Sequence, residues 1–238
     1  MDFYGVIIGL AGVLAASGPV VFASIGETIS ERAGVINLSV NGTILLSAMG
    51  GFAVAVTTGS VLLGFVAGAI IGGLVALLVA FSSITLRQSQ VAVGFVLALV
   101  CRDLSYFLGN PFMGAAGPRL SNVPIPGLSS IPVIGPLFFR HDLMTYASFL
   151  LIGAAWFFIF RTRPGLALRS VGERPAAAHA RGISVNRLRY LYTVLGGMLV
   201  GLAGPMFSLS VKAGWKGTIS GLDGIGWIAL AITIFGAW

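Results

Sequence analysis

Long apolar runs separated by short polar segments dominate the chain. Several of them reach about 18 to 23 residues, the length that a helix needs to cross a hydrocarbon core of about 30 Å. The pattern predicts membrane helices at residues 3–25, 43–57, 61–81, 91–108, 143–160 and 190–209, and another from residue 225 onward. It therefore predicts an all-α, polytopic transmembrane bundle.

Two polar, glycine-rich stretches interrupt this pattern in a similar way. Residues 33–42 and 217–224 each precede an apolar run. Stretches of this kind are expected where helices break in the two halves of a repeated transporter fold. We therefore expect broken or re-entrant segments at both places.

Composition agrees with a membrane bundle. Hydrophobic residues make up 57% of the chain and charged residues only 9%, whereas a soluble domain is about one quarter charged. The 34 glycines favour close helix packing. No polar linker divides the apolar blocks, so we expect one membrane domain over residues 1–238. The last run is short and has no polar flank, so we expect the sequence to stop inside a span.

Basic residues predict the orientation. Seven arginines lie between residues 161 and 189, which places that segment in the cytoplasm by the positive-inside rule. Alternation puts Arg32 and Arg87 on the same side and the N-terminus outside. The outer side then carries Arg119, Arg140, Lys212 and Lys216. These charges lie in short loops without aromatic platforms, so the net charge of +7 does not indicate a nucleic-acid partner.

The predicted outer segment, residues 109–142, is rich in proline. Proline blocks regular helix and favours extended or turn backbone. We expect this segment to form an external cap over the bundle. Its prolines are Pro111, Pro118, Pro124, Pro126, Pro132 and Pro136.

The polar stretch at residues 27–42 is the first candidate for chemistry. Glu27, Glu31 and Arg32 come first, and Asn37, Ser39, Asn41 and Gly42 follow. Non-helical backbone at membrane depth is tolerated where it lines a water-filled cavity or is buried in protein. Uncharged amides and hydroxyls there suit a polyhydroxylated solute rather than an ion. The alternative is a cytoplasmic loop in which Asn41 caps a helix that starts near Thr43.

The second polar stretch supplies further candidates for the translocation path, namely Thr218, Ser220 and Asp223. Near it, Trp215, Trp227 and Tyr106 could stack on a sugar or a base. Interfacial aromatic belts are the alternative explanation for these rings.

Residues 165–189 predict a short cytoplasmic helix. Pro175 suits a first helical turn, Ala176, Ala177 and Ala178 propagate the helix, and Gly182 is a natural C-terminal stop. A small-residue helix can dock into a groove of another protein. It is therefore a candidate coupling element for a motor subunit, and the alternative is a surface helix with no partner.

Arg102 and Asp103 are charges inside an apolar run, and intramembrane charges are functional candidates by default. Adjacent helix positions point apart, so we expect no pairing between them. Placed toward the outer end of the predicted span, they are explained by snorkelling to the interface.

Enzymatic functions find little support. His141 and His179 lie in loops on opposite sides, so a membrane serine has no histidine base. No Walker-type Gly-Lys-Ser/Thr loop occurs, so any ATP hydrolysis belongs to a separate chain. The single cysteine, Cys101, forms neither an intrachain disulfide nor a metal cluster. We expect no catalytic residue, metal or bound cofactor.

Two segments together resemble the permeases of bacterial ATP-binding cassette (ABC) importers. They are the Gly-Glu-x-x-x-Glu-Arg-x-Gly-Val-Ile-Asn-Leu pattern at residues 26–38 and the Val-Gly-Glu-Arg-Pro segment at residues 171–175, which continues to Gly182. The proline-rich outer segment and Gly-Leu-Ala-Gly-Pro at residues 201–205 also fit. The chain resembles the branched-chain amino acid and simple-sugar permease family, and within it the nucleoside branch served by a basic membrane lipoprotein.

This resemblance implies a plasma-membrane permease for nucleosides or simple sugars. It implies a cytosolic ATP-binding cassette ATPase, a second permease subunit, expected as a heterodimer, and an external substrate-binding lipoprotein. It places residues 37–42 near the translocation path. It also assigns ATPase coupling to Gly172, Glu173, Arg174, Pro175, Ala176, Ala177, Ala178 and Gly182. Arg102 and Asp103 depart from the family pattern, which is mostly small and apolar there.

Two other functions stay open. A channel or secondary transporter needs no ATPase and no docking helix. A structural scaffold has no pathway, and it predicts that substitutions of Asn37, Ser39 and Asn41 are silent for uptake.

Overall fold

The structure, a computed structural model, describes residues 3–212 and 214–236. The first two and last two residues of the predicted 1–238 domain lie outside this part. The α-helices are α1 (Phe3–Arg32), α2 (Val40–Thr58), α3 (Val61–Ala80), α4 (Gln90–Gly109), α5 (Ile134–Phe138), α6 (Leu143–Arg161), α7 (Arg163–Glu173), α8 (Pro175–Ala180), α9 (Val185–Met206) and α10 (Ile225–Phe235). Short π-helical turns are η1 (Phe81–Thr85) and η4 (Phe207–Val211), and 3-10 turns are η2 (Asn110–Phe112), η3 (Leu128–Ser130) and η5 (Gly217–Ser220).

The all-α prediction is confirmed. The described residues contain no β-strand and hold six helices long and apolar enough to cross a membrane. The seventh predicted span corresponds to α10, whose 11 described residues are too few to cross alone.

Helix α1 ends seven residues later than predicted, at Arg32 instead of residue 25. The prediction was wrong because Glu27 and Glu31 made the sequence look like a loop. Glutamate is a good helix former, and the fold buries Glu27 completely within the protein. Only residues 33–39 are a non-helical break.

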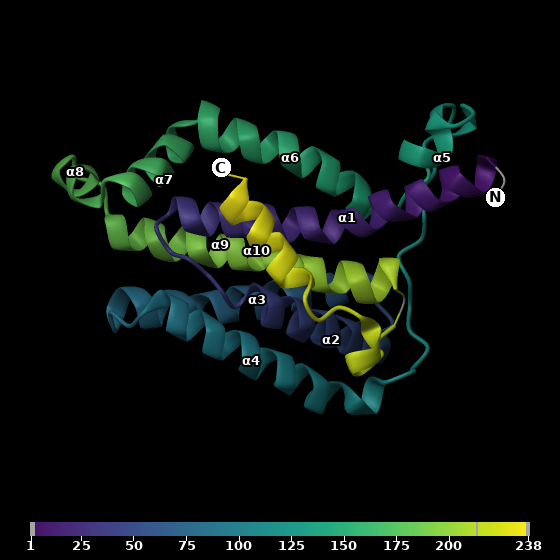
Figure 1. Ribbon diagram of the computed structural model, residues 1–238, viewed down its shortest axis with the longest axis horizontal. Helices are drawn as coiled ribbons and strands as arrows, with labels where there is room; N and C mark the ends of the chain where they lie inside the picture. The colour runs from purple at the N-terminus through teal and green to yellow at the C-terminus, as the bar shows by residue number, and fades with distance from the viewer. Residues whose placement is uncertain (1–2, 213, 237–238) are drawn as a thin grey trace.

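The long helices form one elongated bundle (Figure 1). Helices α1, α3 and α9 run along its middle, with α4 and α6 on opposite edges. The N-terminal end of α1 and α5 lie at one end, which we call the α5 end. Helices α7 and α8 lie at the other, the α8 end, together with Arg32 and the turn that carries Arg87. The segments predicted to be cytoplasmic thus share one end of the bundle.

The crossing of α3 and α9 depends on glycines that face each other. Gly68 and Gly72 on α3 meet Gly197 and Gly201 on α9. A Cβ atom at Gly72 would fall on the carbonyl oxygen of Gly197, and one at Gly201 would fall on that of Gly68. Each helix places two glycines four residues apart, the spacing that lets membrane helices approach closely.

The predicted cap is irregular for most of its length. Its backbone bonds to the chain that follows α9, from the Gly114 N–H to the Trp215 carbonyl (3.2 Å) and from the Leu120 N–H to the Leu209 carbonyl (2.9 Å). Two 3-10 turns and the five-residue α5, which contains Pro136, are its only described helical pieces. The expectation of extended and turn backbone holds except for these short pieces.

Candidate functional site

The break at residues 33–39 turns the chain back into the bundle before α2 begins (Figure 1). The Glu27 Oε1 atom accepts a hydrogen bond from the Asn37 backbone N–H at 2.7 Å. The Asn37 Oδ1 atom accepts bonds from the Ser39 N–H (3.1 Å) and the Ser39 hydroxyl. All three side chains are buried. The break is therefore held by its own polar groups, and α2 starts inside the bundle rather than at its end.

Asn41 does not cap the helix that contains it. Helix α2 already begins at Val40, and its N-cap residue Ser39 makes no side-chain capping bond. Instead, the Asn41 Oδ1 atom accepts bonds from the Gly224 N–H (2.9 Å) and the Gly226 N–H (3.2 Å), which caps the start of α10. The capping alternative was right about the chemistry of Asn41 and wrong about which helix it serves.

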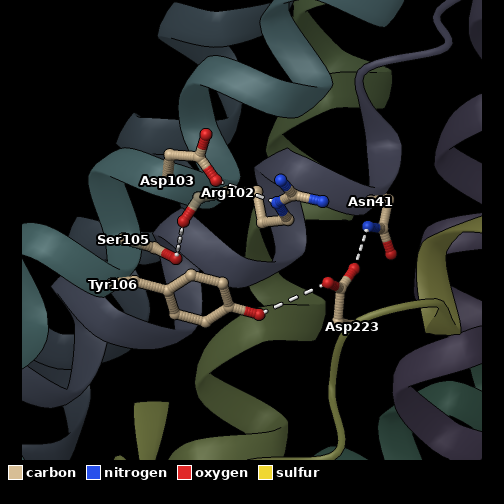
Figure 2. A network of polar contacts seen from close by, with 6 residues as sticks. All are labelled: Asn41, Arg102, Asp103, Ser105, Tyr106 and Asp223. Atoms are coloured by element: carbon tan, nitrogen blue, oxygen red, sulfur yellow. Dashed lines mark hydrogen bonds and ion pairs between the residues drawn. The ribbon is translucent and has the colours of Figure 1, made fainter. Parts of the chain in front are cut away.

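The two polar breaks therefore meet each other. The Asn41 Nδ2 atom donates to the Asp223 Oδ1 atom at 2.8 Å, as Figure 2 shows. Gly226 makes the contact possible, because a Cβ atom there would fall on the Asn41 backbone. Two helices, α2 and α10, thus begin at the same place, and the positive ends of their dipoles converge beside the Asp223 carboxylate.

Other predicted path residues lie apart from this contact. Thr218 is exposed in η5, and the buried Ser220 uses its hydroxyl to accept from the Leu222 N–H at 3.4 Å. Gly42 packs against α4, where a Cβ atom would fall on the Ala98 carbonyl. The structure brings Asn41 and Asp223 together, and the lining role of the whole set stays a prediction.

Tyr106 and Arg102 join Asn41 and Asp223, although their place was not predicted. The Tyr106 hydroxyl donates to the Asp223 Oδ2 atom at 3.4 Å. The Arg102 guanidinium lies on the side of Asp223 and Asn41 in Figure 2. No sequence signal linked α4 to the second polar stretch, because the contact joins residues 117 positions apart.

One expectation about Arg102 and Asp103 was wrong, and the other stays a prediction. The side chains do pair, with the Arg102 Nε atom 3.0 Å from the Asp103 Oδ1 atom. The apolar helix also runs from Gln90 to Phe112, so Arg102 lies ten residues before its last residue, or roughly 15 Å at the helical rise. Arg102 thus lies near the middle of the apolar helix, and snorkelling of its side chain to the interface stays a prediction.

The aromatic candidates have separate roles. Trp215 is fully buried, so its ring is not available to a solute. It packs 6.2 Å from the Tyr106 ring and thereby positions it. Trp227 packs 6.2 Å from Phe95 and is partly exposed.

The predicted short helix is confirmed as α8. It runs from Pro175 to Ala180. Gly182, whose φ of +81° suits glycine, follows its end, with bonds from the Gly182 N–H to the His179 carbonyl (2.9 Å) and from the Ile183 N–H to the Ala178 carbonyl (3.1 Å). Helix α7 precedes it and was not predicted. It starts where the Thr162 hydroxyl accepts from the Gly165 N–H at 3.1 Å.

Helices α7 and α8 enclose a hollow of about 520 Å³ at the α8 end. Its lining combines apolar and charged groups, including Leu166, Ser170, Glu173, Ala177 and Arg181. Glu173, Ala177 and Arg181 are exposed.

The segment predicted to couple to an ATPase touches the end of α1 directly. A Cβ atom at Gly172 would fall on the Arg32 carbonyl oxygen, and Arg189 Nε donates to the Ala33 carbonyl at 3.3 Å. An ion pair joins Arg32 to Glu173 at 3.7 Å, but the Glu173 side chain is 66% exposed. An exposed pair of this kind contributes at most about 1 kcal/mol, so the close backbone contact of Gly172 is what positions the segment.

Glu27 provides the first testable prediction. Its Oε2 atom has no hydrogen-bond partner among the described residues, and only Oε1 is used, by Asn37. Glu27→Gln keeps that acceptor, whereas Glu27→Ala leaves the buried Asn37 N–H unpaired, which costs about 1–3 kcal/mol. We expect the thermal stability of the purified protein to fall for Glu27→Ala and to stay near wild type for Glu27→Gln. Equal losses of thermal stability in both variants would show that the negative charge of Glu27 itself is needed.

A described bundle of six helices long and apolar enough to cross a membrane, in which two polar breaks meet, is the architecture of a polytopic membrane protein. The family model described as branched-chain amino acid transport system / permease component matches residues 9–238, and the chain belongs to this family. It is a multi-pass protein of the cell membrane. Membership implies a separate ATPase that hydrolyses ATP and a substrate-binding protein.

Three relatives illustrate the range of the family. The chain is 37% identical to a provisionally assigned glucose ABC transporter permease protein of Haloferax volcanii, over 96% of this chain and 70% of that protein. It is 34% identical to the nucleoside ABC transporter permease protein NupC of Lactococcus lactis, over 96% of this chain and 75% of that protein. It is 32% identical to the guanosine ABC transporter permease protein NupQ of Bacillus subtilis, over 94% of this chain and 74% of that protein. No solved structure matches the chain.

Proposed function

We propose that this chain is the permease subunit of an ABC importer for nucleosides or simple sugars, and that residues 172–182 couple it to the cytosolic ATPase. Two of the three relatives above are named as nucleoside or guanosine permeases and one as a glucose permease. Hydrogen-bonding groups at the meeting point of the two breaks, namely the Asn41 amide, the Asp223 carboxylate and the Tyr106 hydroxyl, suit such solutes. The chain performs no bond chemistry and binds no cofactor of its own.

The observation that carries the coupling role is the contact between Gly172 and the end of α1. Helix α8 follows Gly172 by three residues, so a force on α8 reaches the Arg32 carbonyl through one tight backbone contact. From Arg32 the chain passes through the break at residues 33–39 into α2, which carries Asn41. A movement of the ATPase at the α8 end is therefore transmitted to the start of α10.

The partner subunits follow from the same proposal. Asp103 is charged, 66% exposed and near the middle of a span, a position that is unfavourable against lipid. A second permease subunit, as a heterodimer, would enclose this face in a central path. An external substrate-binding lipoprotein would deliver the solute at the α5 end.

Uptake measurements test the proposal. Cells carrying the full transporter are given radiolabelled nucleosides and simple sugars, with wild type compared to Glu173→Lys and Ala177→Pro. Proline at position 177 disfavours helical backbone at Ala176, in the first turn of α8, and the charge reversal places a cation beside Arg32. We expect uptake to fall at least about tenfold, with normal membrane insertion and loss of the co-purifying ATPase.

Ala180→Leu is the matched control, because Ala180 is exposed on α8 but does not line the hollow. It should leave uptake and co-purification near wild type. Unchanged uptake in Glu173→Lys and Ala177→Pro would overturn the coupling role. An ATP-independent channel or carrier would then be the better assignment.

A further inference from the structure

We propose that Asp223, Arg102 and Tyr106 form a solute-binding site inside the membrane that recognises two adjacent hydroxyl groups, such as the diol of a ribose. The inference rests on the proposed function and specifies the chemistry of its substrate. The three residues come from two separate parts of the chain, α4 and the segment before α10 (Figure 2).

The depth of these residues is the first argument. Arg102 lies near the midpoint of the span from Gln90 to Phe112, and Tyr106 follows one helical turn later. Asp223 lies at a similar depth because it bonds to Tyr106 and to Asn41. Ionised groups in the middle of a membrane face a cavity or a partner rather than lipid.

Exposure is the second argument. The Asp223 side chain is exposed, and the Arg102 side chain is 36% exposed, although both lie at this depth. Asn41, which bonds to Asp223, is 97% buried, so it holds the Asp223 carboxylate in place. The charged groups therefore point outward from a rigid base, onto the face where we place the central path.

Unused hydrogen-bonding capacity is the third argument. A carboxylate offers about four acceptor positions, and the Asp223 oxygens receive one bond each in the described structure, from Asn41 and Tyr106. The guanidinium has five N–H donors, of which Arg102 gives one to Asp103. A hydroxyl group both donates and accepts, so two adjacent hydroxyls can donate to Asp223 while they accept from Arg102.

The charge of the site limits the class of solute. Arg102, Asp103 and Asp223 carry a formal charge of −1 together, which disfavours anions such as nucleotides. The Tyr106 ring, held by the buried Trp215, adds a flat apolar surface beside the carboxylate. An uncharged ribosyl or hexosyl solute fits this combination. A zwitterionic amino acid is the competing ligand, because its ammonium and carboxylate groups would pair with Asp223 and Arg102.

The test compares each solute with an analogue that lacks two adjacent hydroxyls. Uptake KM is measured in cells with the full transporter, for adenosine against 2′,3′-dideoxyadenosine and for glucose against 2,3-dideoxyglucose. Wild type should prefer the hydroxylated solute it imports, and Asp223→Asn should reduce that preference at least about tenfold, as expected for loss of a charged hydrogen bond. The same binding protein serves both variants, so its own selectivity cancels in the comparison.

Tyr106→Phe keeps the test decisive if Asp223→Asn is inactive. It removes one hydroxyl and should reduce the preference by about two- to tenfold. Tyr190→Phe is the matched control, since the Tyr190 hydroxyl bonds Thr85 away from this site at 2.6 Å, and it should leave the preference unchanged.

Three results separate the possible failures. An unchanged preference in both Tyr106→Phe and any active Asp223→Asn transporter overturns the diol site. Competition by leucine that is stronger than competition by the nucleoside or sugar also overturns it, in favour of an amino-acid ligand. Absence of ATP-dependent uptake of every nucleoside and sugar in wild type would instead defeat the proposed function itself.

Discussion

Leucine in place of Gly197 is expected to destabilise the whole bundle. A Cβ atom at this position would overlap the Ala76 side chain and lie 2.7 Å from the Gly72 carbonyl oxygen, so α3 and α9 must move apart. Overpacking a well-packed interior costs about 1–3 kcal/mol, and we expect the upper end because backbone atoms cannot move aside as a side chain can. The measurement is the temperature at which half of the detergent-purified protein loses its monodisperse gel-filtration peak.

Gly153→Leu is the control for this prediction. Gly153 also lies on a membrane helix, α6, but no atom lies within 4 Å of the position that its Cβ would take. Its transition temperature should stay near wild type. Equal losses for Gly153→Leu and Gly197→Leu would mean that added bulk on any helix, rather than the α3–α9 contact, sets stability.

Alanine in place of Asn41 is expected to abolish transport without preventing membrane insertion. The change removes two bonds to the N-terminus of α10 and one to the Asp223 carboxylate. Loss of a helix cap costs about 0.5–2 kcal/mol, and the bond to a charged group adds about 1.5–3 kcal/mol. Uptake of radiolabelled nucleoside should fall at least about tenfold at an unchanged level of protein in the membrane.

Asn186→Ala makes the same chemical change at an exposed position in the first turn of α9. Its uptake should match wild type. Normal uptake by Asn41→Ala would support the scaffold alternative, in which the polar break is silent for transport.

Much of the helical framework could be predicted from the sequence because it depends on local patterns. The length of the apolar runs located all six spans, and Pro175 and Gly182 located both ends of α8. The end of α1 was misplaced because charge suggested a loop, while burial of Glu27 against the Asn37 N–H was a tertiary effect.

The centre of the candidate site was less predictable because it too depends on tertiary contacts. Asn41 was identified as a capping residue, but its target lies 183 and 185 residues further along the chain. Tyr106 bonds to Asp223, and Arg102 lies on the same side, because α4 packs against α2. No local sequence spacing predicts either contact. Single residues of the site could therefore be identified from the sequence, but their contacts with one another could not.

The cap that Asn41 provides also has a consequence for biogenesis. The ribosome releases Asn41 long before Gly224, and α10 receives its N-terminal hydrogen bonds from Asn41 rather than from a residue next to it in the chain. The first two helices must therefore be inserted, and the break between them formed, before α10 finds its partner. Closure of a contact across so many residues is slow relative to local helix formation, so α10 docks late, and the assembled first part of the chain serves as the template on which the last described helix is placed.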